Sequence, residues 1–492
     1  MKRRIIASVL ALCMAALPVT AQMPVLQEAA LTAHAADCYT FDEETGTLTL
    51  YGSVDKSALT EIDGYAVLSV TAEPGTVLPE DCSYLFSGFS AQRIDLRQAD
   101  TSQVTQMQGM FELCSSVTVL DLSGFDTSRV TDMNGMFFRC SSLTALNVTG
   151  FDTSQVADMN RMFFDCAGLT ELDVTGFDTA QVTDMENMFG GCSGLTALDV
   201  TGFDTAQVTD MRNMFRGCTG LNALDLTGFD TSNAVLMGAM FSGCTGLNTL
   251  DLTGFDTSNV TNMPAMFRNC TSLTALDVSG FDTSNVTDMS AMFQNCTSLT
   301  ALDVSGFATS GVKNMSLMFY DCTGLQSLDL SGFDTSGVIN MGAMFSGCTG
   351  LNALDLAGFD ISNVTDVSNM FDTCPSLHVL TLGEGFTEVT EDMMLSNTPV
   401  WANRTAPETI VSGDAFYAAF TNEGANTYVR ILTDLPGDVN ADEWVNVLDA
   451  VSLQKYLVRE GGLISPGAAD MNADGRIDVI DLTLLKQKLL RS

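Results

Sequence analysis

One pattern of apolar and polar positions recurs every 26 residues through most of the chain. Its fixed point is a cysteine, and eleven cysteines follow one another at this spacing without exception: Cys114, Cys140, Cys166, Cys192, Cys218, Cys244, Cys270, Cys296, Cys322, Cys348 and Cys374. We number the cysteine as repeat position 0. Strict repetition at such a period is typical of a solenoid, in which each unit buries its apolar face only against its neighbours.

Each unit predicts one short strand. In the unit that begins at Cys270, positions 3, 6 and 8 are Leu273, Leu276 and Val278. Because side chains alternate between the two faces of a strand, these residues point inward while positions 5, 7 and 9 face outward.

The second half of each unit predicts a short helix. Met289, Met292, Phe293 and Cys296 occupy positions 19, 22, 23 and the next position 0. This is the i, i+3, i+4, i+7 spacing of one face of a two-turn helix. The predicted fold is therefore an α/β solenoid, a leucine-rich-repeat-type right-handed coil of 26-residue units.

The repeat accounts for a composition rich in methionine, phenylalanine and cysteine. Positions 19 and 22 hold 21 of the 27 Met, and positions 11 and 23 hold 21 of the 29 Phe. The repeated cysteines lie on the same apolar stripe, so we interpret them as small buried hydrophobes. Cys38 and Cys82 lie outside the register, and they are the pair predicted to form a disulfide.

The N-terminus predicts secretion. Lys2, Arg3 and Arg4 precede an apolar stretch over residues 5–17, which is too short to span a bilayer. We interpret residues 1–36 as a signal peptide and expect an extracellular protein without a membrane span.

Acidic residues dominate the charge, with 60 Asp and Glu against 21 Lys and Arg and a net charge of −39. This balance argues against a nucleic-acid partner. Position 12, as in Asp282, is interpreted as a side-chain cap of its turn. An outward row at position 7 consists of Asp173, Asp199, Asp225, Asp251, Asp277, Asp303, Asp329 and Asp355. The row is explained either by duplication of one unit or by a surface that binds Ca²⁺ or a basic partner.

The C-terminus contains two Asp-rich segments that repeat each other 32 residues apart. Oxygen donors at positions 1, 3, 5, 7 (through the backbone), 9 and 12 are what a 12-residue calcium loop requires. The first loop would use Asp438, Asn440, Asp442, Trp444, Asn446 and Asp449. The second would use Asp470, Asn472, Asp474, Arg476, Asp478 and Asp481. We therefore predict two Ca²⁺ sites, the first weakened by Glu443 where the second has Gly475.

The repeat resembles a known family. Units such as GFDTSNVTDMSAMFQNCTSLTALDVS resemble the BspA-like leucine-rich repeats of bacterial surface proteins, over residues 85–395. Residues 37–84 resemble the β-rich N-terminal cap of such proteins, and residues 396–435 are interpreted as a C-terminal cap and linker. The resemblance implies adhesion and the binding of a protein or glycan ligand.

Residues 436–492 resemble a type I dockerin, in which two F-hand calcium loops are each followed by one helix. The resemblance implies docking onto a cohesin domain of a scaffoldin in a cellulosome-like complex for polysaccharide degradation. The cohesin contacts that it implies are Val447, Leu448, Gln454, Lys455, Val479, Ile480, Lys486 and Gln487.

Together these features predict a secreted, non-catalytic binding protein. Glycoside hydrolysis needs two carboxylates in distinct environments, whereas most acids of the repeats are equivalent copies. His378 is the only histidine in the predicted body of the protein, which argues against Ser/His/Asp chemistry. The alternatives are a polysaccharide-degrading enzyme component, a protease inhibitor and a structural spacer.

Overall fold

The structure is a computed structural model that describes residues 32–33, 38–396, 401–404, 410–411, 422, 424–430, 436–440, 444–463, 465–472 and 475–491. The predicted signal peptide thus lies outside the described residues, apart from residues 32–33.

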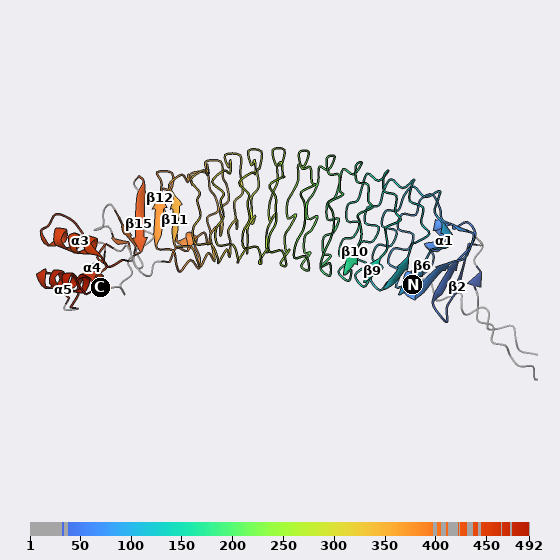
Figure 1. Ribbon diagram of the computed structural model, residues 1–492, viewed down its shortest axis with the longest axis horizontal. Helices are drawn as coiled ribbons and strands as arrows, with labels where there is room; N and C mark the ends of the chain where they lie inside the picture. The colour runs from blue at the N-terminus through green and yellow to red at the C-terminus, as the bar shows by residue number, and fades with distance from the viewer. Residues whose placement is uncertain are drawn as a thin grey trace, which may run out of the picture.

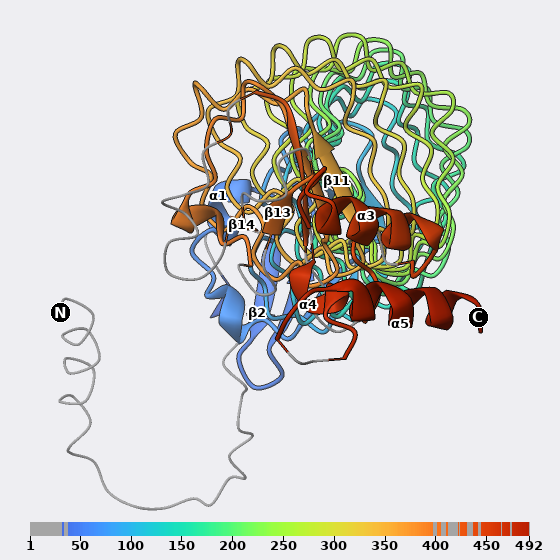
Figure 2. The ribbon, with the colours of Figure 1, turned by 90° about the vertical axis from the view of Figure 1, so that its left-hand side faces the viewer.

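The repeats form a solenoid of about 13 turns, so the predicted solenoid is confirmed. Its coils lie side by side along a curved rod (Figure 1), and the view from the C-terminal end shows them following one another (Figure 2). One continuous apolar core runs from Cys38 to Tyr428.

The N-terminal end is a six-stranded sheet in the order β1-β2-β3-β4-β6-β8. β1, β2 and β3 pair antiparallel, whereas β3, β4, β6 and β8 pair parallel in the register of the repeat. The elements of this half are β1 (Thr32–Ala33), β2 (Tyr39–Asp42), β3 (Thr47–Leu50), α1 (Lys56–Leu59), η1 (Gly64–Ala66), β4 (Ser69–Ala72), β5 (Thr76–Val77), β6 (Arg93–Asp95), β7 (Ala99–Asp100), β8 (Val119–Asp121), β9 (Ala145–Leu146) and β10 (Glu171–Leu172).

The C-terminal end of the solenoid is closed by a second sheet, in the order β11-β12-β15-β13-β14. β11 and β12 pair parallel, and β15 covers the edge of β12 in antiparallel pairing. The elements of this sheet and of the C-terminal module are β11 (Ala353–Leu356), β12 (Val379–Leu382), η2 (Glu391–Met393), β13 (Trp401–Asn403), β14 (Ile410–Val411), β15 (Asn426–Arg430), α3 (Val447–Leu457), α4 (Pro466–Ala469) and α5 (Val479–Leu489).

The helix predicted in each unit is wrong. Positions 19 to 25 form a run of tight turns, because the residues at positions 21 and 25 take left-handed backbone conformations that a helix excludes. In one coil these residues are Arg161 (φ 56°) and Asp165 (φ 59°). Alternate amides bond to the next coil: Met159 N–H donates to Asp184 O and Arg161 N–H to Glu186 O.

The apolar positions nevertheless point inward as predicted. The phenylalanines of position 23 stack in one file, with ring centroids 5.5–6.2 Å apart from Phe86 to Phe371. Met159 and Met162 are fully buried beside them.

The eleven repeated cysteines are buried and free, which confirms their interpretation as core residues. Each has a further role that the sequence did not reveal. The thiol of Cys270, for example, donates to the carbonyl of Phe241 in the preceding coil at 3.1 Å. Burial raises the pKa of these thiols, to about 12 for Cys244, so they stay protonated donors.

The disulfide predicted between Cys38 and Cys82 is wrong, since both residues are free and buried. They lie at different corners of the coil. The carbonyl of Cys38 accepts from Tyr51 N–H beside the end of β3, whereas Cys82 N–H bonds to Gln106 O in the turn register. The thiol of Cys82 donates to Pro79 O at 3.2 Å.

A second polar file crosses the interior at position 13. Each threonine is at most 1% exposed, and its hydroxyl donates to the position-12 carbonyl of the next coil, as Thr257 does to Asp282 O at 2.9 Å. The file consists of Thr101, Thr127, Thr153, Thr179, Thr205, Thr231, Thr257, Thr283, Thr309 and Thr335.

Replacing Thr257 by Val should lower the free energy of unfolding by about 1–2 kcal/mol, because the Asp282 carbonyl loses its buried donor while side-chain volume is kept. The matched control is Thr274→Val, at an exposed strand position. The urea midpoint of the solenoid transition measures both. Equal midpoints for the two variants would contradict the role given to this file.

Candidate calcium loops and repeat surfaces

The C-terminal module is built twice from the same parts. α3 and α5 lie side by side (Figures 1 and 2) and pack around their own small core, which includes Leu453 and its counterpart Leu485, both fully buried. Each helix begins with a capping box, from Asn446 and Asp449 in α3 and from Asp478 and Asp481 in α5.

The final aspartate of each predicted calcium loop closes that loop. Asp449 accepts Val439 N–H with Oδ1 at 2.7 Å and Asn446 N–H with Oδ2 at 2.8 Å. Asp481 repeats this arrangement with Met471 N–H and Asp478 N–H, both at 2.8 Å. The two ends of each loop are thereby held together.

The donor set fits Ca²⁺. Asp449 and Asp481 are 0% exposed, and no ion pair joins either carboxylate to another residue in the described part of the chain. A buried carboxylate without a cation is costly. Asp438 is also buried, at 2% exposure, and Asp470 is half-buried. Hard oxygen donors converging at such a loop are the ligands that Ca²⁺ prefers.

The remaining donors are placed unevenly. Asn440 and Asn472 occupy position 3 of the loops, while Trp444 and Arg476 at position 7 expose their side chains, as expected where only the backbone carbonyl would bind. Asp442, Asp474 and Glu443 lie outside the described residues. In the range that the structure describes, no three His, Cys, Asp or Glu side chains form a metal cluster, so complete coordination stays a prediction.

The second loop has the backbone that the sequence predicts for its turn. Gly475 has φ +77°, and its N–H donates to Asp470 Oδ2 at 2.8 Å. A left-handed residue at this position costs a non-glycine about 1–2 kcal/mol.

Adjacent aliphatic side chains are exposed at the start of both long helices. Val447 and Leu448 are 67% and 56% exposed, and Val479 and Ile480 are 66% and 51% exposed. The other residues with an implied cohesin contact are exposed as well: Gln454, Lys455, Lys486 and Gln487. Such matched apolar patches on a small domain are typical of a protein interface.

The position-7 row is exposed along the solenoid, and each of its aspartates caps its own turn. Asp225, for example, accepts Thr227 N–H at 3.0 Å and the Thr227 hydroxyl at 2.8 Å. These hydrogen bonds hold the pKa of Asp225 and Asp251 below the ordinary value. Three members, Asp173, Asp199 and Asp225, line an open groove of about 740 Å³.

The turn does not require the negative charge. Asn147 replaces aspartate in one coil and makes the same bonds, to Thr149 N–H at 3.1 Å and to its hydroxyl at 2.8 Å. Capping of the turn therefore requires an Asx residue at position 7 but does not by itself distinguish aspartate from asparagine, so duplication of one unit and a ligand surface both stay open as explanations of the row. Position 12 caps its turn as predicted, with Asp282 accepting Ser284 N–H at 2.9 Å.

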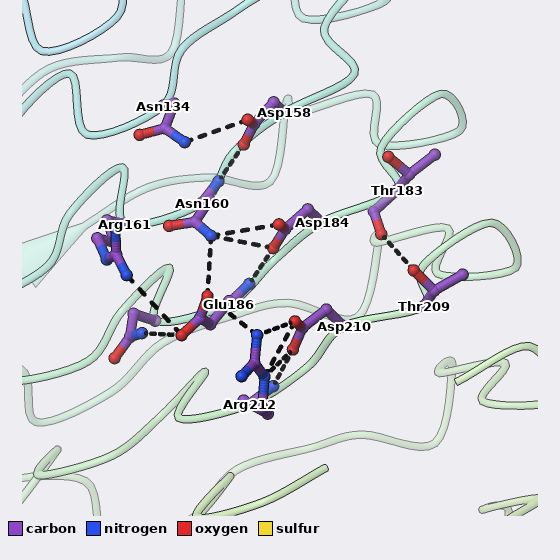
Figure 3. A network of polar contacts seen from close by, with 11 residues as sticks. Asn134, Asp158, Asn160, Arg161, Thr183, Asp184, Glu186, Thr209, Asp210 and Arg212 are labelled. Carbon is purple, nitrogen blue, oxygen red and sulfur yellow. Dashed lines mark hydrogen bonds and ion pairs between the residues drawn. The ribbon is translucent and has the colours of Figure 1, made fainter. Parts of the chain in front are cut away.

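A polar network on the turn side of the solenoid escaped the sequence analysis (Figure 3). Asn160 donates to Asp184 at 3.2 Å and to Glu186 at 3.2 Å, and Arg212 holds Asp210 through Nε at 2.9 Å. Burial raises the pKa of Asp184, and the neighbouring carboxylates Asp158 and Asp210 add to the effect. The amide of Asn160 and the guanidinium of Arg212 thus donate hydrogen bonds to a row of partly buried carboxylates and offset their negative charge.

Comparison with known families accounts for most of the chain. Residues 80–197, 194–301 and 296–381 match the family described as "Mycoplasma protein of unknown function, DUF285". Residues 436–490 match the type I dockerin domain, whose members bind calcium. No curated protein matches the chain.

Solved structures that match are leucine-rich repeat proteins. One, from Eubacterium ventriosum, is 16% identical, with a TM-score of 0.32 over 73% of this chain and 95% of that one. A leucine-rich cell surface protein from Faecalibacterium prausnitzii is also 16% identical, with a TM-score of 0.30 over 70% and 98%.

Over the residues described, no helix combines the length and apolar character that crossing a bilayer demands.

Calcium titration of the chelated protein should fill two unequal sites. The second loop should bind more tightly because it has Gly475 at the sixth position, which adopts a left-handed backbone without penalty, whereas the first loop has Glu443 there. Calorimetry gives the stoichiometry, and the fluorescence of Trp444, 74% exposed in the first loop, reports that loop. Asp481→Asn should remove the tight phase and Asp449→Asn the weak one. Two sites of equal affinity would contradict the expected difference.

Proposed function

The chain belongs to the DUF285 family of repeat proteins and ends in a type I dockerin domain, and on this basis we propose that it is a secreted, non-catalytic binding protein. Its dockerin docks in a calcium-dependent manner onto a cohesin of a scaffoldin. The solenoid then presents its repeat surface to a protein or glycan ligand, in the context of polysaccharide degradation outside the cell.

The observation that carries the docking proposal is the pair of exposed aliphatic dipeptides. Val447-Leu448 and Val479-Ile480 occupy positions 10 and 11 of the two calcium loops, where they are also the first two residues of α3 and α5. Because the loop-closing aspartates fix where these helices start, calcium binding and exposure of the apolar patch are coupled.

The build of the solenoid supports a binding role over catalysis. A catalytic acid needs a proton affinity set apart from that of its neighbours, whereas four adjacent position-7 carboxylates, from Asp173 to Asp251, share one capping geometry and one direction of pKa shift. His378 directly precedes β12, and its Nδ1 contacts the Ser376 carbonyl at 2.7 Å.

Chelation should abolish cohesin binding while the solenoid stays folded, because the solenoid core is separate from the module core. A pull-down with and without EDTA, paired with a urea midpoint, measures both effects. As a control with calcium present, alanine at Val447, Leu448, Val479 and Ile480 should weaken binding at least tenfold without lowering calcium affinity. Cohesin capture that survives EDTA would refute the proposal.

The position-7 row is tested by replacing Asp225, Asp251 and Asp277 with Asn, which keeps the turn, as Asn147 shows. Binding of Ca²⁺ or polylysine to the solenoid should weaken several-fold, because three adjacent charges are lost. The matched control replaces Asp230, Asp256 and Asp282 at position 12 with Asn, which removes the same number of charges from a different row of the solenoid surface. Equal binding by the two triple variants and the parent protein would reject a ligand surface at position 7.

A further inference from the structure

The N-terminal cap contains a hollow of about 510 Å³. Its lining comes from α1, η1 and the turns before the first complete repeat unit. Leu59, Leu85 and Phe89 are 2–5% exposed and form its apolar floor. The insertion of α1 and η1 between β3 and β4 creates this hollow, since those segments replace the tight turns of an ordinary coil.

Two tyrosines at this hollow are unusually exposed. Tyr65 is 82% exposed and Tyr84 is 50% exposed, and both line the hollow. Tyr84 holds a left-handed backbone at φ 57°, in the register where the next coil has Gly109. A Cβ on Gly109 would lie 2.4 Å from the Tyr84 ring, so glycine is what lets the ring lie there.

Two of the charged groups beside the rings are already engaged, and the carboxylates of Glu112 and Asp132 also lie near Tyr84. Lys56 Nζ forms an ion pair with Asp81 at 2.8 Å, and Asp63 accepts Tyr65 N–H at 3.1 Å as the cap of η1. The hydroxyl-bearing Ser83 and Ser87 also line the hollow. The surface therefore offers flat apolar faces, hydroxyl groups and the acceptor oxygens of Glu112, and it leaves no excess of positive charge for an anion.

We propose that this hollow is a binding site for a neutral glycan. A pyranose ring has one face of C–H groups, which packs on an aromatic ring, and an edge of hydroxyls that needs neutral donors and acceptors. Tyr65 and Tyr84 supply the rings, and Ser83 and Ser87 supply the hydroxyls. The site is independent of the dockerin and of the position-7 row, so it goes beyond the proposed function and does not depend on it.

The test uses the full chain with calcium present and soluble mixed-linkage β-glucan, xylan and mannan as probes, measured by affinity electrophoresis and calorimetry. Tyr65→Ala removes an exposed ring. Tyr84→Gly removes the other and relieves its left-handed strain, so neither variant should unfold the cap. The matched control is Leu317→Gly, a left-handed residue (φ 60°) at the same repeat position in a distant coil.

At least one neutral polysaccharide should bind to the parent protein, at least tenfold more weakly to each tyrosine variant, and unchanged to Leu317→Gly. Binding to none of the three polysaccharides would overturn the proposal. The proposal would also be overturned if the tyrosine variants bound a polysaccharide as tightly as the parent protein does. Binding only to a carboxylated probe such as polygalacturonate would overturn it as well. A variant that lost only cohesin binding would have a defect in the dockerin, and the polysaccharide measurements would still decide whether the hollow binds a glycan.

Discussion

Hydrogen bonding from each coil to the next is the constraint on which the whole solenoid depends. Between positions 19 and 25, alternate amides donate to the following coil and the amides between them donate within their own coil: Met107 N–H bonds to Asp132 O, whereas Met110 N–H bonds to Met107 O. An unpaired buried amide is costly. One inserted residue would break this alternation in its coil, which explains why the cysteines keep their spacing of 26 residues without exception.

The same constraint selects the polar residues inside the core. The Phe241 carbonyl already accepts from Cys244 N–H within its coil, and the thiol of Cys270 adds a second donor. Thr257 likewise supplies a hydroxyl donor to the Asp282 carbonyl of the next coil. A small side chain with one donor fits both places, whereas a larger one would push the coils apart. The same buried side chains therefore fill the core and donate hydrogen bonds to backbone carbonyls.

The sequence predicted the period, the inward positions and the solenoid, because burial is read directly from apolar spacing. It did not predict how the chain turns between Met289 and Cys296, since turns with left-handed residues can bring positions i, i+3, i+4 and i+7 to one face as a helix does. A signal was present: glycine occurs at position 21 in Gly109 and Gly135 and at position 25 in Gly191 and Gly217. Glycine is unfavourable in the interior of a helix, so its presence at these two positions argues against one.

Ligand chemistry fixes the spacing within a calcium loop, so the sequence predicts each ligand position, and complete coordination stays a prediction. The loop-closing bonds of Asp449 and Asp481 depend on the folded backbone and could not be predicted. The polar network around Asn160 and Glu186 was not predictable. It joins residues of neighbouring coils, and its members change from coil to coil. Residues that occur in only one or two coils do not stand out in a sequence analysis that looks for positions shared by all coils.

The caps follow from the edges that a parallel solenoid leaves open. An exposed strand edge invites pairing with another chain. β2 covers β3 at one end and β15 covers β12 at the other, both antiparallel and outside the repeat. Within the coils, each side chain lies beside copies of itself, so a distinct constellation is hard to build there. The caps are free of that restriction, and Tyr65 and Tyr84 lie where the N-terminal cap departs from the repeat.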